Sequence, residues 1–473
     1  MQMTKLERYE KNLAKLYLYF LPFHMLIPFS FLNSIFIGLA KRSSFLFLII
    51  GFIISIISRK RIMVGNDSGG KLFKNFILLY IIVDTTSILM ALILYFKLGT
   101  IGGEDTFKSV LKKIPYTIFY VIFLYYNKEI FRFLAKEEID CILNKIVNIC
   151  LFLGLLQIGV LFVRGPFCII YDAINLMFGA WSSADIIKTG RIALITIEPA
   201  TIAGFFGIII FPYIFSKWII DNFYAKDLIK FILLCIVLYF TKSTTGYVLF
   251  SVDFMIFCII YFLKRKSNFA KKSLIIILGI ILSFAVFNRL SKEEQISNNM
   301  FSVFDKLLNT ENRASMSRRV GLYINIEIFK NYPILGVGNG NQGFFYRQYF
   351  PDFAFSSEWA TEHYDEAAYV VLDGGVFFGS FASGYGIIGV ILLIVFLYKS
   401  FMIISINKNI FGYLYYFYIM SILSIIIYGF SSTLVGEYAV WFVLSLPLAI
   451  SYWKFNVQYS RNEQILHIMN NCS

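Results

Sequence analysis

The motifs Ser315-Met-Ser-Arg-Arg-Val-Gly-Leu-Tyr323 and Pro333-Ile-Leu-Gly-Val-Gly-Asn-Gly340 lie in the one long hydrophilic stretch of a chain that is otherwise apolar. This stretch carries paired arginines and a glycine-rich turn, and apolar sequence flanks it on both sides. It divides the chain into an N-terminal transmembrane part (1–289), one large loop (290–375) and a C-terminal transmembrane part that ends in a cytoplasmic tail (376–473). We predict short helices within the loop.

The composition excludes a soluble fold. The 473 residues are 58% hydrophobic and 15% charged, against about 25% charged residues in soluble domains, and the mean hydropathy is +0.70. A helix needs about 20 apolar residues to cross a bilayer. We predict an all-α polytopic membrane protein with about twelve transmembrane helices, at residues 17–39, 43–58, 73–96, 108–126, 141–163, 192–216, 228–241, 245–263, 273–289, 376–398, 411–430 and 437–453.

The lysine and arginine residues predict the orientation of the chain. In the short loops they are concentrated on the side of the basic N-terminus, and basic short loops face the cytoplasm. We therefore expect both termini in the cytoplasm and the large loop in the periplasm, at the inner membrane of a bacterium. The formal net charge of +14 follows from these basic flanks, so we expect no nucleic-acid partner.

The paired arginines point to an anionic ligand. We predict a short amphipathic helix with Ser315 or Ser317 as its N-cap and Pro333 beyond its end. Arg318 and Arg319 then fall in the first turn, where a cation is unfavourable for the helix dipole unless an anion is bound there. The alternative is a solvated basic pair at an interface. The glycines that follow are interpreted as a turn that folds the chain back, since no strand precedes them.

A second polar group interrupts the predicted span at 192–216. Glu198 enters this apolar run, and a charge at the centre of a span costs about 2.5–3.5 kcal/mol on insertion scales. Arg191 stands seven residues earlier, about two helical turns away on one face, so both side chains can line one cavity. The alternative for Glu198 is a plain interhelical hydrogen bond. Lys242 lies in a short external turn. It either adds positive charge at the opening of the same cavity or extends its ammonium group to the membrane interface. Asp84 is the strongest further candidate within a span.

His363 is a candidate general base, because imidazole titrates near neutral pH. Several carboxylates surround it, namely Glu362, Asp365, Glu366 and Asp373. The alternative is a solvated acidic stretch. No zinc-binding motif occurs in the sequence, and we expect no metal and no cofactor.

A series of motifs follows one order along residues 185–400: Arg191 before Glu198-Pro199, then Ser243-Thr-Thr-Gly246, Arg318-Arg319 with Tyr323, Asn331-Tyr-Pro-Ile-Leu-Gly-Val-Gly338, and Ser383-Gly-Tyr-Gly-Ile-Ile-Gly389. This ordered set resembles the Wzy-type O-antigen polymerases and their relatives, the O-antigen ligases. The resemblance implies a GT-C-like membrane glycosyltransferase that polymerises undecaprenyl-pyrophosphate-linked repeat units at the periplasmic face, in lipopolysaccharide biosynthesis. Membrane lipids, a chain-length regulator and a flippase are the implied partners.

The resemblance also implies a division of labour among the candidates. The pyrophosphate of the lipid-linked donor would be bound by Arg191, Lys242, Arg318, Arg319 and Tyr323. Glu198, His363 or Asp365 would orient or deprotonate the acceptor hydroxyl. Ligases of this superfamily typically have an asparagine after the loop histidine. Here Tyr364 follows His363, which favours a polymerase and weakens the case for a catalytic His363.

Two alternative functions remain open from the sequence. One is an O-antigen ligase or a capsule or exopolysaccharide polymerase, which shares the donor chemistry. The other is a polysaccharide flippase or transporter, which predicts a charged central cavity and no large external domain. The sequence contains no internal repeat of the kind that is common in transporters.

Overall fold

The structure is a computed structural model that describes residues 5–24, 26–32, 42–58, 68–98, 100–101, 104–105, 114–196, 198–221, 225–264, 313–338, 341–356, 364, 377–430, 432 and 437–454. The long helices are α1 (Lys5–Tyr19), α3 (Ser44–Ser58), α4 (Ser68–Leu98), α6 (Ile114–Phe133), α7 (Lys136–Phe162), α10 (Pro199–Phe205) continuing through η2 (Phe206–Ile210) into α11 (Phe211–Ile220), α12 (Ala225–Thr241), α13 (Thr244–Lys264), α16 (Arg313–Asn331), α18 (Phe377–Ile406) and α20 (Tyr413–Gly429). The shorter elements are η1 (Ile27–Phe29), α8 (Pro166–Asn175), α9 (Ser183–Thr189), η3 (Gln342–Phe345), η4 (Asp352–Ser356), α19 (Lys408–Phe411), α21 (Tyr438–Ser445), η5 (Leu446–Ala449) and the two-residue strands β1 (Thr100–Ile101) and β2 (Glu104–Asp105).

The described part of the chain is helical apart from the small antiparallel β1–β2 pair. Five of its helical segments are long and apolar enough to cross a membrane: Gly69–Met90, Lys136–Phe162, Pro199–Ile220, Thr244–Lys264 and Phe377–Ile406. α3 and α20 are shorter apolar helices. These segments support an all-helical polytopic membrane protein, and the count of twelve spans stays a prediction. The predicted span at 273–289 lies outside the described residues.

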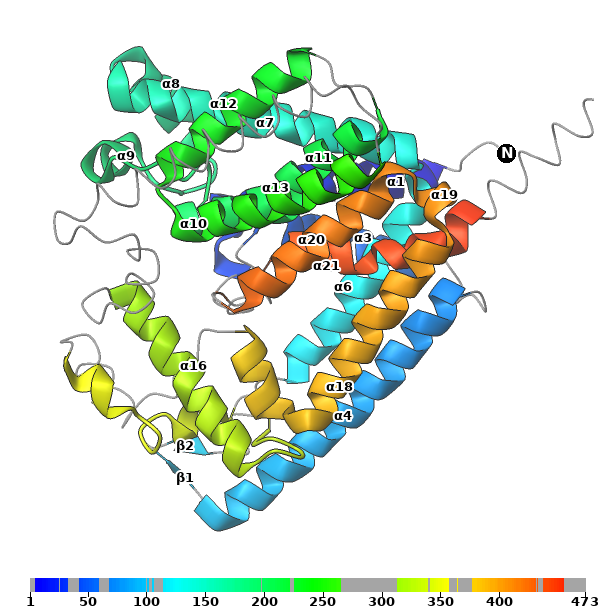
Figure 1. The fold of residues 1–473 in the computed structure, drawn as a ribbon, viewed down its shortest axis with the longest axis vertical. Coiled ribbons are helices and arrows are strands. Elements are labelled where there is room, and N and C mark those ends of the chain that lie inside the picture. The colour runs from blue at the N-terminus through cyan, green and yellow to red at the C-terminus, as the bar shows by residue number, and fades with distance from the viewer. Residues whose placement is uncertain are drawn as a thin grey trace, which may run out of the picture.

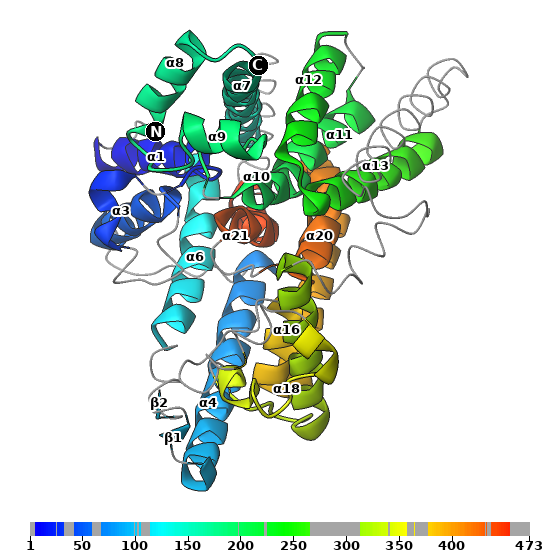
Figure 2. The ribbon, with the colours of Figure 1, turned by 90° about the vertical axis from the view of Figure 1, so that its left-hand side faces the viewer.

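The helices form two groups. In Figure 1, α7 to α13 gather in the upper half, α4, α16 and α18 lie in the lower half, and α20 and α21 lie between them. The largest apolar core joins the upper group to α1, α6, α20 and α21. A second core lies beneath α16, and a third joins α4, α6 and α18. Figure 2 shows α4 projecting past the other helices to the β1–β2 pair.

The predicted first span, 17–39, is wrong. α1 ends at Tyr19 and pairs with α3, where Ser58 Oγ donates a hydrogen bond of 2.9 Å to Glu10. The chain then turns, and the 3-10 helix η1 follows. Pro22 and Pro28 give the physical reason, because proline lacks the N–H that continues a helix and clashes with the preceding turn. The basic residues expected in a flanking segment therefore lie in a helix that packs within the bundle.

The predicted span 192–216 begins later than expected. Residues 192–196 are not helical, and the helix starts at Pro199, the position where proline is most favourable. The residue before proline avoids the helical region, and Glu198 is accordingly extended at φ −139° and ψ 140°. The inference that Arg191 and Glu198 share one helical face is therefore wrong.

The large loop is seated on α18 through the backbone. Its turn donates two hydrogen bonds, from Val337 N to the Ser383 carbonyl at 2.9 Å and from Gly338 N to the Gly384 carbonyl at 3.0 Å. The Ile387 N–H of α18 donates in return to the carbonyl of Pro333 at 2.7 Å. The glycine-rich turn thus folds the chain back after α16, and it contacts the glycine motif that interrupts α18.

Two glycines make this seat possible. Gly386 has φ 62° and ψ −164°, a non-helical conformation inside α18 that side chains with a Cβ rarely adopt. A Cβ there would overlap the Ile334 carbonyl, and a Cβ at Gly336, with φ 67°, would overlap the backbone of Ser383. The break in α18 frees backbone carbonyls, and the loop turn supplies N–H groups that satisfy them.

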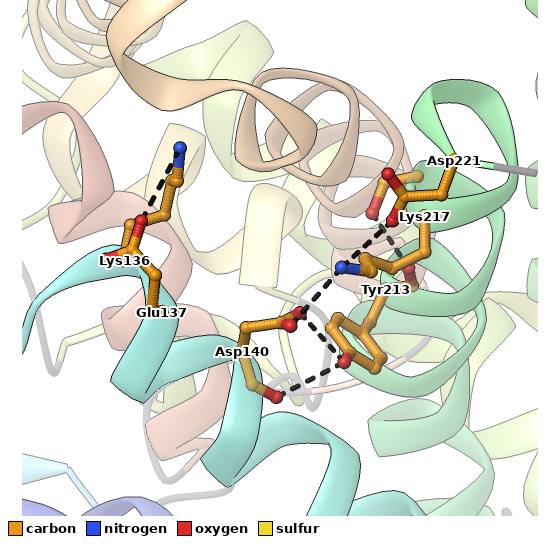
Figure 3. A network of polar contacts seen from close by, with 7 residues as sticks. Lys136, Glu137, Asp140, Tyr213, Lys217 and Asp221 are labelled. Atoms are coloured by element: carbon orange, nitrogen blue, oxygen red, sulfur yellow. Dashed lines mark hydrogen bonds and ion pairs between the residues drawn. The ribbon is translucent and has the colours of Figure 1, made fainter.

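A polar network joins α7 and α11 at the far end of the bundle from the segment 191–198 (Figure 3). Lys217 forms ion pairs of 3.2 Å with Asp140 and 3.1 Å with Asp221. The Tyr213 hydroxyl donates to Asp140 Oδ1 at 3.0 Å. These groups connect the start of α7 to the end of α11. The site described next lies at the opposite end of these helical segments.

Candidate active site

The irregular segment before α10 is held by buried side chains. Gln157, in α7, donates from Nε2 to the Leu194 carbonyl at 2.7 Å, and its Oε1 accepts from the N–H groups of Leu194 and Ala193 at 2.8 and 3.1 Å. The Tyr171 hydroxyl also donates to the Leu194 carbonyl, at 3.0 Å. Non-helical backbone at membrane depth is tolerated where protein groups satisfy it. These bonds therefore fix the position of the flanking residues Arg191 and Glu198.

Arg191 and Lys242 lie together at the turn between α12 and α13. The Arg191 guanidinium donates from Nε to the Thr241 carbonyl at 3.1 Å and from Nη2 to the Lys242 carbonyl at 3.4 Å. Lys242 has a positive φ of 50°, which is uncommon for a residue with a side chain. Both side chains are half-buried. Two cations are thus held at one place by the backbone of a tight turn.

Glu198 occupies the N-cap position of α10 and is exposed. Its side chain makes no capping hydrogen bond, and the structure gives it no ion pair with Arg191. Its carbonyl accepts a hydrogen bond of 2.9 Å from Thr196. No ion pair of this carboxylate is found among the described residues, and Glu198 presents a solvent-accessible carboxylate beside Pro199.

α10 lies between α13 and α20 and contacts both closely. A Cβ at Gly246 would lie 2.6 Å from the Ala203 Cβ, and a Cβ at Gly204 would lie 2.7 Å from Cζ of Tyr428. Small residues allow helices in a membrane to approach in this way. The turn that carries Lys242 therefore packs on one side of α10, and the Tyr428 ring packs on the other.

A second group of charged side chains lies near Tyr428. Arg42 donates from Nη2 to both carboxylate oxygens of Glu437, at 2.9 and 3.0 Å, and the side chains are only 6% and 19% exposed. Arg42 also donates to the Pro22 carbonyl at 3.4 Å. Arg42, Glu437 and Arg318 all interact electrostatically with the Tyr428 phenol. Sequence reasoning did not single out Arg42 or Glu437, because the pair joins residues 395 apart.

Arg318 brings the large loop to this group. It is half-buried, and within the described part of the chain it has no hydrogen-bond or ion-pair partner. α16 begins at Arg313, so Arg318 lies in the second helical turn, and Ser315 and Ser317 lie inside the helix. The predictions of a serine N-cap and of a first-turn arginine pair are therefore wrong. The helix does end two residues before Pro333, as expected.

Arg319 and Tyr323 point to a different neighbour. The Arg319 guanidinium lies over the Phe353 ring at 5.0 Å, and Tyr323 meets the same ring edge-on at 5.8 Å. Successive residues on a helix are rotated by about 100°, which carries Arg319 away from the Arg318 side. The adjacent arginines thus have separate surroundings.

Three other candidates stand apart from these groups. His363 and Asp365 lie outside the described residues. Tyr364 between them packs against Phe355 at 5.1 Å and lies under the Arg347 guanidinium at 4.9 Å. The Tyr385 hydroxyl donates to Asp84 Oδ1 at 3.3 Å, which ties α4 to α18 beside the seat of the loop.

Part of the chain is similar to a known protein family. Residues 229–394 match the O-antigen ligase family. The matched region, roughly a third of the chain, runs from α12 to the middle of α18 and includes Lys242, both loop arginines and the glycine motifs. A search of curated proteins found no match. The matched region therefore contains the loop and its seat, while Arg42, Arg191 and Glu437 lie outside it.

The charges at this end of the bundle favour an anion. The side chains around α10 comprise the cations Arg42, Arg191, Lys242 and Arg318 and the carboxylates Glu198 and Glu437. The excess is positive even with Arg42 neutralised by Glu437. Electrostatic attraction is strong where water is excluded, and guanidinium groups match the geometry of phosphate oxygens.

Proposed function

We propose that this protein is a membrane glycosyltransferase of the O-antigen polymerase and ligase superfamily. It transfers a glycan from a lipid pyrophosphate, of the undecaprenyl class, to a sugar hydroxyl of an acceptor at the periplasmic face of a bacterial inner membrane. The observation that carries the proposal is Arg318. A half-buried guanidinium that has no hydrogen-bond or ion-pair partner among the described residues, at the end of an apolar bundle and inside the region that matches the O-antigen ligase family, fits a bound anion.

The proposed reaction is a displacement at the anomeric carbon. The acceptor oxygen forms a bond to that carbon as the bond to the pyrophosphate oxygen breaks, and the electron pair leaves with the pyrophosphate. Arg318, with Arg191 and Lys242 across α10, stabilises the charge that develops there. The hydroxyl proton passes to a carboxylate or an imidazole. Glu198 is the described candidate, and His363 and Asp365 are the other two.

The separate surroundings of the loop arginines refine this assignment. Arg318 interacts electrostatically with Tyr428, as Arg42 and Glu437 do, whereas Arg319 and Tyr323 contact Phe353. We therefore assign the pyrophosphate to Arg318 and give Arg319 and Tyr323 a different task. Arg42 positions Glu437 at the start of α21, since its guanidinium is already committed to that carboxylate.

Alanine at Arg318 tests the proposal. Loss of one preorganised donor to a developing anion costs about 10²–10³ in rate, so Arg318→Ala should abolish long glycan chains on the host glycolipid. Lys330→Ala is the matched control, because Lys330 is an exposed cation on the same helix, 62% exposed and paired with Glu327. Full-length chains from Arg318→Ala at normal protein level would refute the assignment.

Polymerase is the proposed activity and ligase is the alternative, since both release lipid pyrophosphate. The sequence favours a polymerase because Tyr364 follows His363, whereas the matching family is described as O-antigen ligase. Deletion of the gene separates them. A glycolipid core bearing a single repeat unit would identify a polymerase, and a core with no repeat unit would identify a ligase.

A further inference from the structure

The large loop carries an aromatic surface made of Tyr323 and Phe353, with Arg319 at its edge. The two rings are 41% and 36% exposed. Tyr323 stands edge-on to Phe353, and the Arg319 guanidinium lies over the Phe353 ring. Arg319 and Tyr323 are four residues apart, so they project from one face of α16. The surface is thus an exposed patch of rings beside a cation.

The elements that carry these rings are anchored in the apolar core of the loop. α16 buries Met316, Val320, Ile324 and Ile328 in the core of the loop, each at most 2% exposed. Ala354 follows Phe353 in η4 and is fully buried in the same core. Phe353 therefore stands next to an anchored residue. The loop already has its own apolar core, so the exposed rings are not needed to complete it.

We propose that this aromatic surface binds the sugar rings of the lipid-linked glycan, an inference that rests on the proposed function. A sugar ring presents a C–H face that packs on an aromatic ring and hydroxyl groups that need hydrogen-bond donors. Rigid aromatic side chains with an adjacent guanidinium supply both. Arg318 and Arg319 are neighbours in sequence, with Cα atoms about 3.8 Å apart. Their side chains diverge around α16, so a glycan that extends from a pyrophosphate at Arg318 around the helix reaches Arg319 and the rings.

The composition of the surface distinguishes a glycan from a lipid tail. A surface that binds acyl chains is expected to be aliphatic and free of charge, whereas this one has Arg319 over a ring and the exposed Asp352 beside Phe353. Charged and aromatic groups together match a ligand that is apolar on its face and polar at its edge. The surface is therefore assigned to sugar rings, and a membrane surface becomes an outcome of the test.

The test measures binding of the free repeat-unit oligosaccharide, released from its lipid by mild acid, to the purified full-length protein in nanodiscs. Saturation-transfer NMR and calorimetry report binding without requiring transfer. Phe353→Ala and Tyr323→Ala should each weaken binding roughly fivefold to tenfold, as expected for the loss of one aromatic contact. Phe353→Tyr should retain it. Ile334→Ala is the control, since Ile334 is an apolar side chain of the same loop that is 64% exposed and lies outside the surface.

Each outcome decides the matter. Selective weakening in the two ring variants, with unchanged thermal stability, supports the glycan surface. Equal affinity of wild type and Phe353→Ala overturns it. It is also overturned if the wild type does not bind the oligosaccharide but associates with glycan-free vesicles in a Phe353-dependent manner. Glycan binding is measured apart from transfer, so its failure leaves the Arg318 result intact, and failure of the Arg318 prediction leaves the binding result readable.

Discussion

Removal of the Glu437 carboxylate should strongly destabilise the protein. Glu437→Ala would leave the Arg42 guanidinium, only 6% exposed, with the Pro22 carbonyl at 3.4 Å in place of a carboxylate that accepts at 2.9 and 3.0 Å. Breaking a buried ion pair by removing one partner costs about 3–5 kcal/mol. That is a large share of the 5–15 kcal/mol that keeps a typical domain folded. The start of α21, where Glu437 occupies the N-cap position, should loosen as a result.

The same reasoning predicts that loss of both partners is milder than loss of one. Replacing a buried ion pair by apolar residues of similar size is often neutral or stabilising by about 1–4 kcal/mol. Arg42→Met combined with Glu437→Leu should therefore unfold later than Glu437→Ala in a denaturant titration of the solubilised protein. The reasoning is refuted if the free energy of unfolding of Glu437→Ala lies within about 1 kcal/mol of the wild-type value. It is also refuted if the double variant is destabilised by the sum of the destabilisations that Arg42→Met and Glu437→Leu cause singly.

Two further predictions concern the loop seat and a helix cap. Gly386→Ala should detach the loop from α18, because the backbone conformation alone costs about 1–3 kcal/mol, and trypsin should then cut between α16 and α18 faster. Gly379→Ala is the control and should not speed cutting, since the nearest atom to a Cβ there is 3.2 Å away. Equal rates of cutting in the two variants would contradict this prediction. Hydrogen bonds from Ser182 lower the pKa of Asp185, so the stabilisation is present above the unfolded value of about 3.9 and is lost as pH falls through the folded pKa. The melting-temperature gap between wild type and Asp185→Asn should accordingly close at low pH, and a gap independent of pH would count against it.

The sequence predicted the long helices better than their ends. Apolar length is a local property, so the runs at 73–96 and 245–263 fall within helices, the run at 141–163 extends one residue beyond α7, and the described residues of the run at 376–398 lie in α18. The failures at 17–39 and 192–216 have one physical cause, since each apolar run contains prolines that stop or restart the helix while leaving hydropathy unchanged. Hydropathy indicates which segments are buried, whereas the backbone restrictions of proline determine where a helix begins.

The candidate site was only partly visible in the sequence. Arg191 and Lys242 lie together through an irregular segment and a turn, whereas the sequence predicted a helix face for Arg191. Arg42 and Glu437 were missed because their partnership depends on packing across the whole chain. One signal was available for Glu437, since it is a carboxylate that directly opens the last apolar run. The different neighbours of Arg318 and Arg319 depend on the exact rotation of α16, which sequence does not give.

The attachment of the loop to α18 has a consequence for how this protein can diversify. The seat is made of N–H and C=O groups, together with glycines that permit the close approach. The formation of main-chain hydrogen bonds does not depend on which side chains the loop carries. Substitutions on the outer face of α16 and in η4 can accumulate without dislodging the loop, provided that the glycines remain. One backbone seat can therefore carry loops with many different side-chain surfaces.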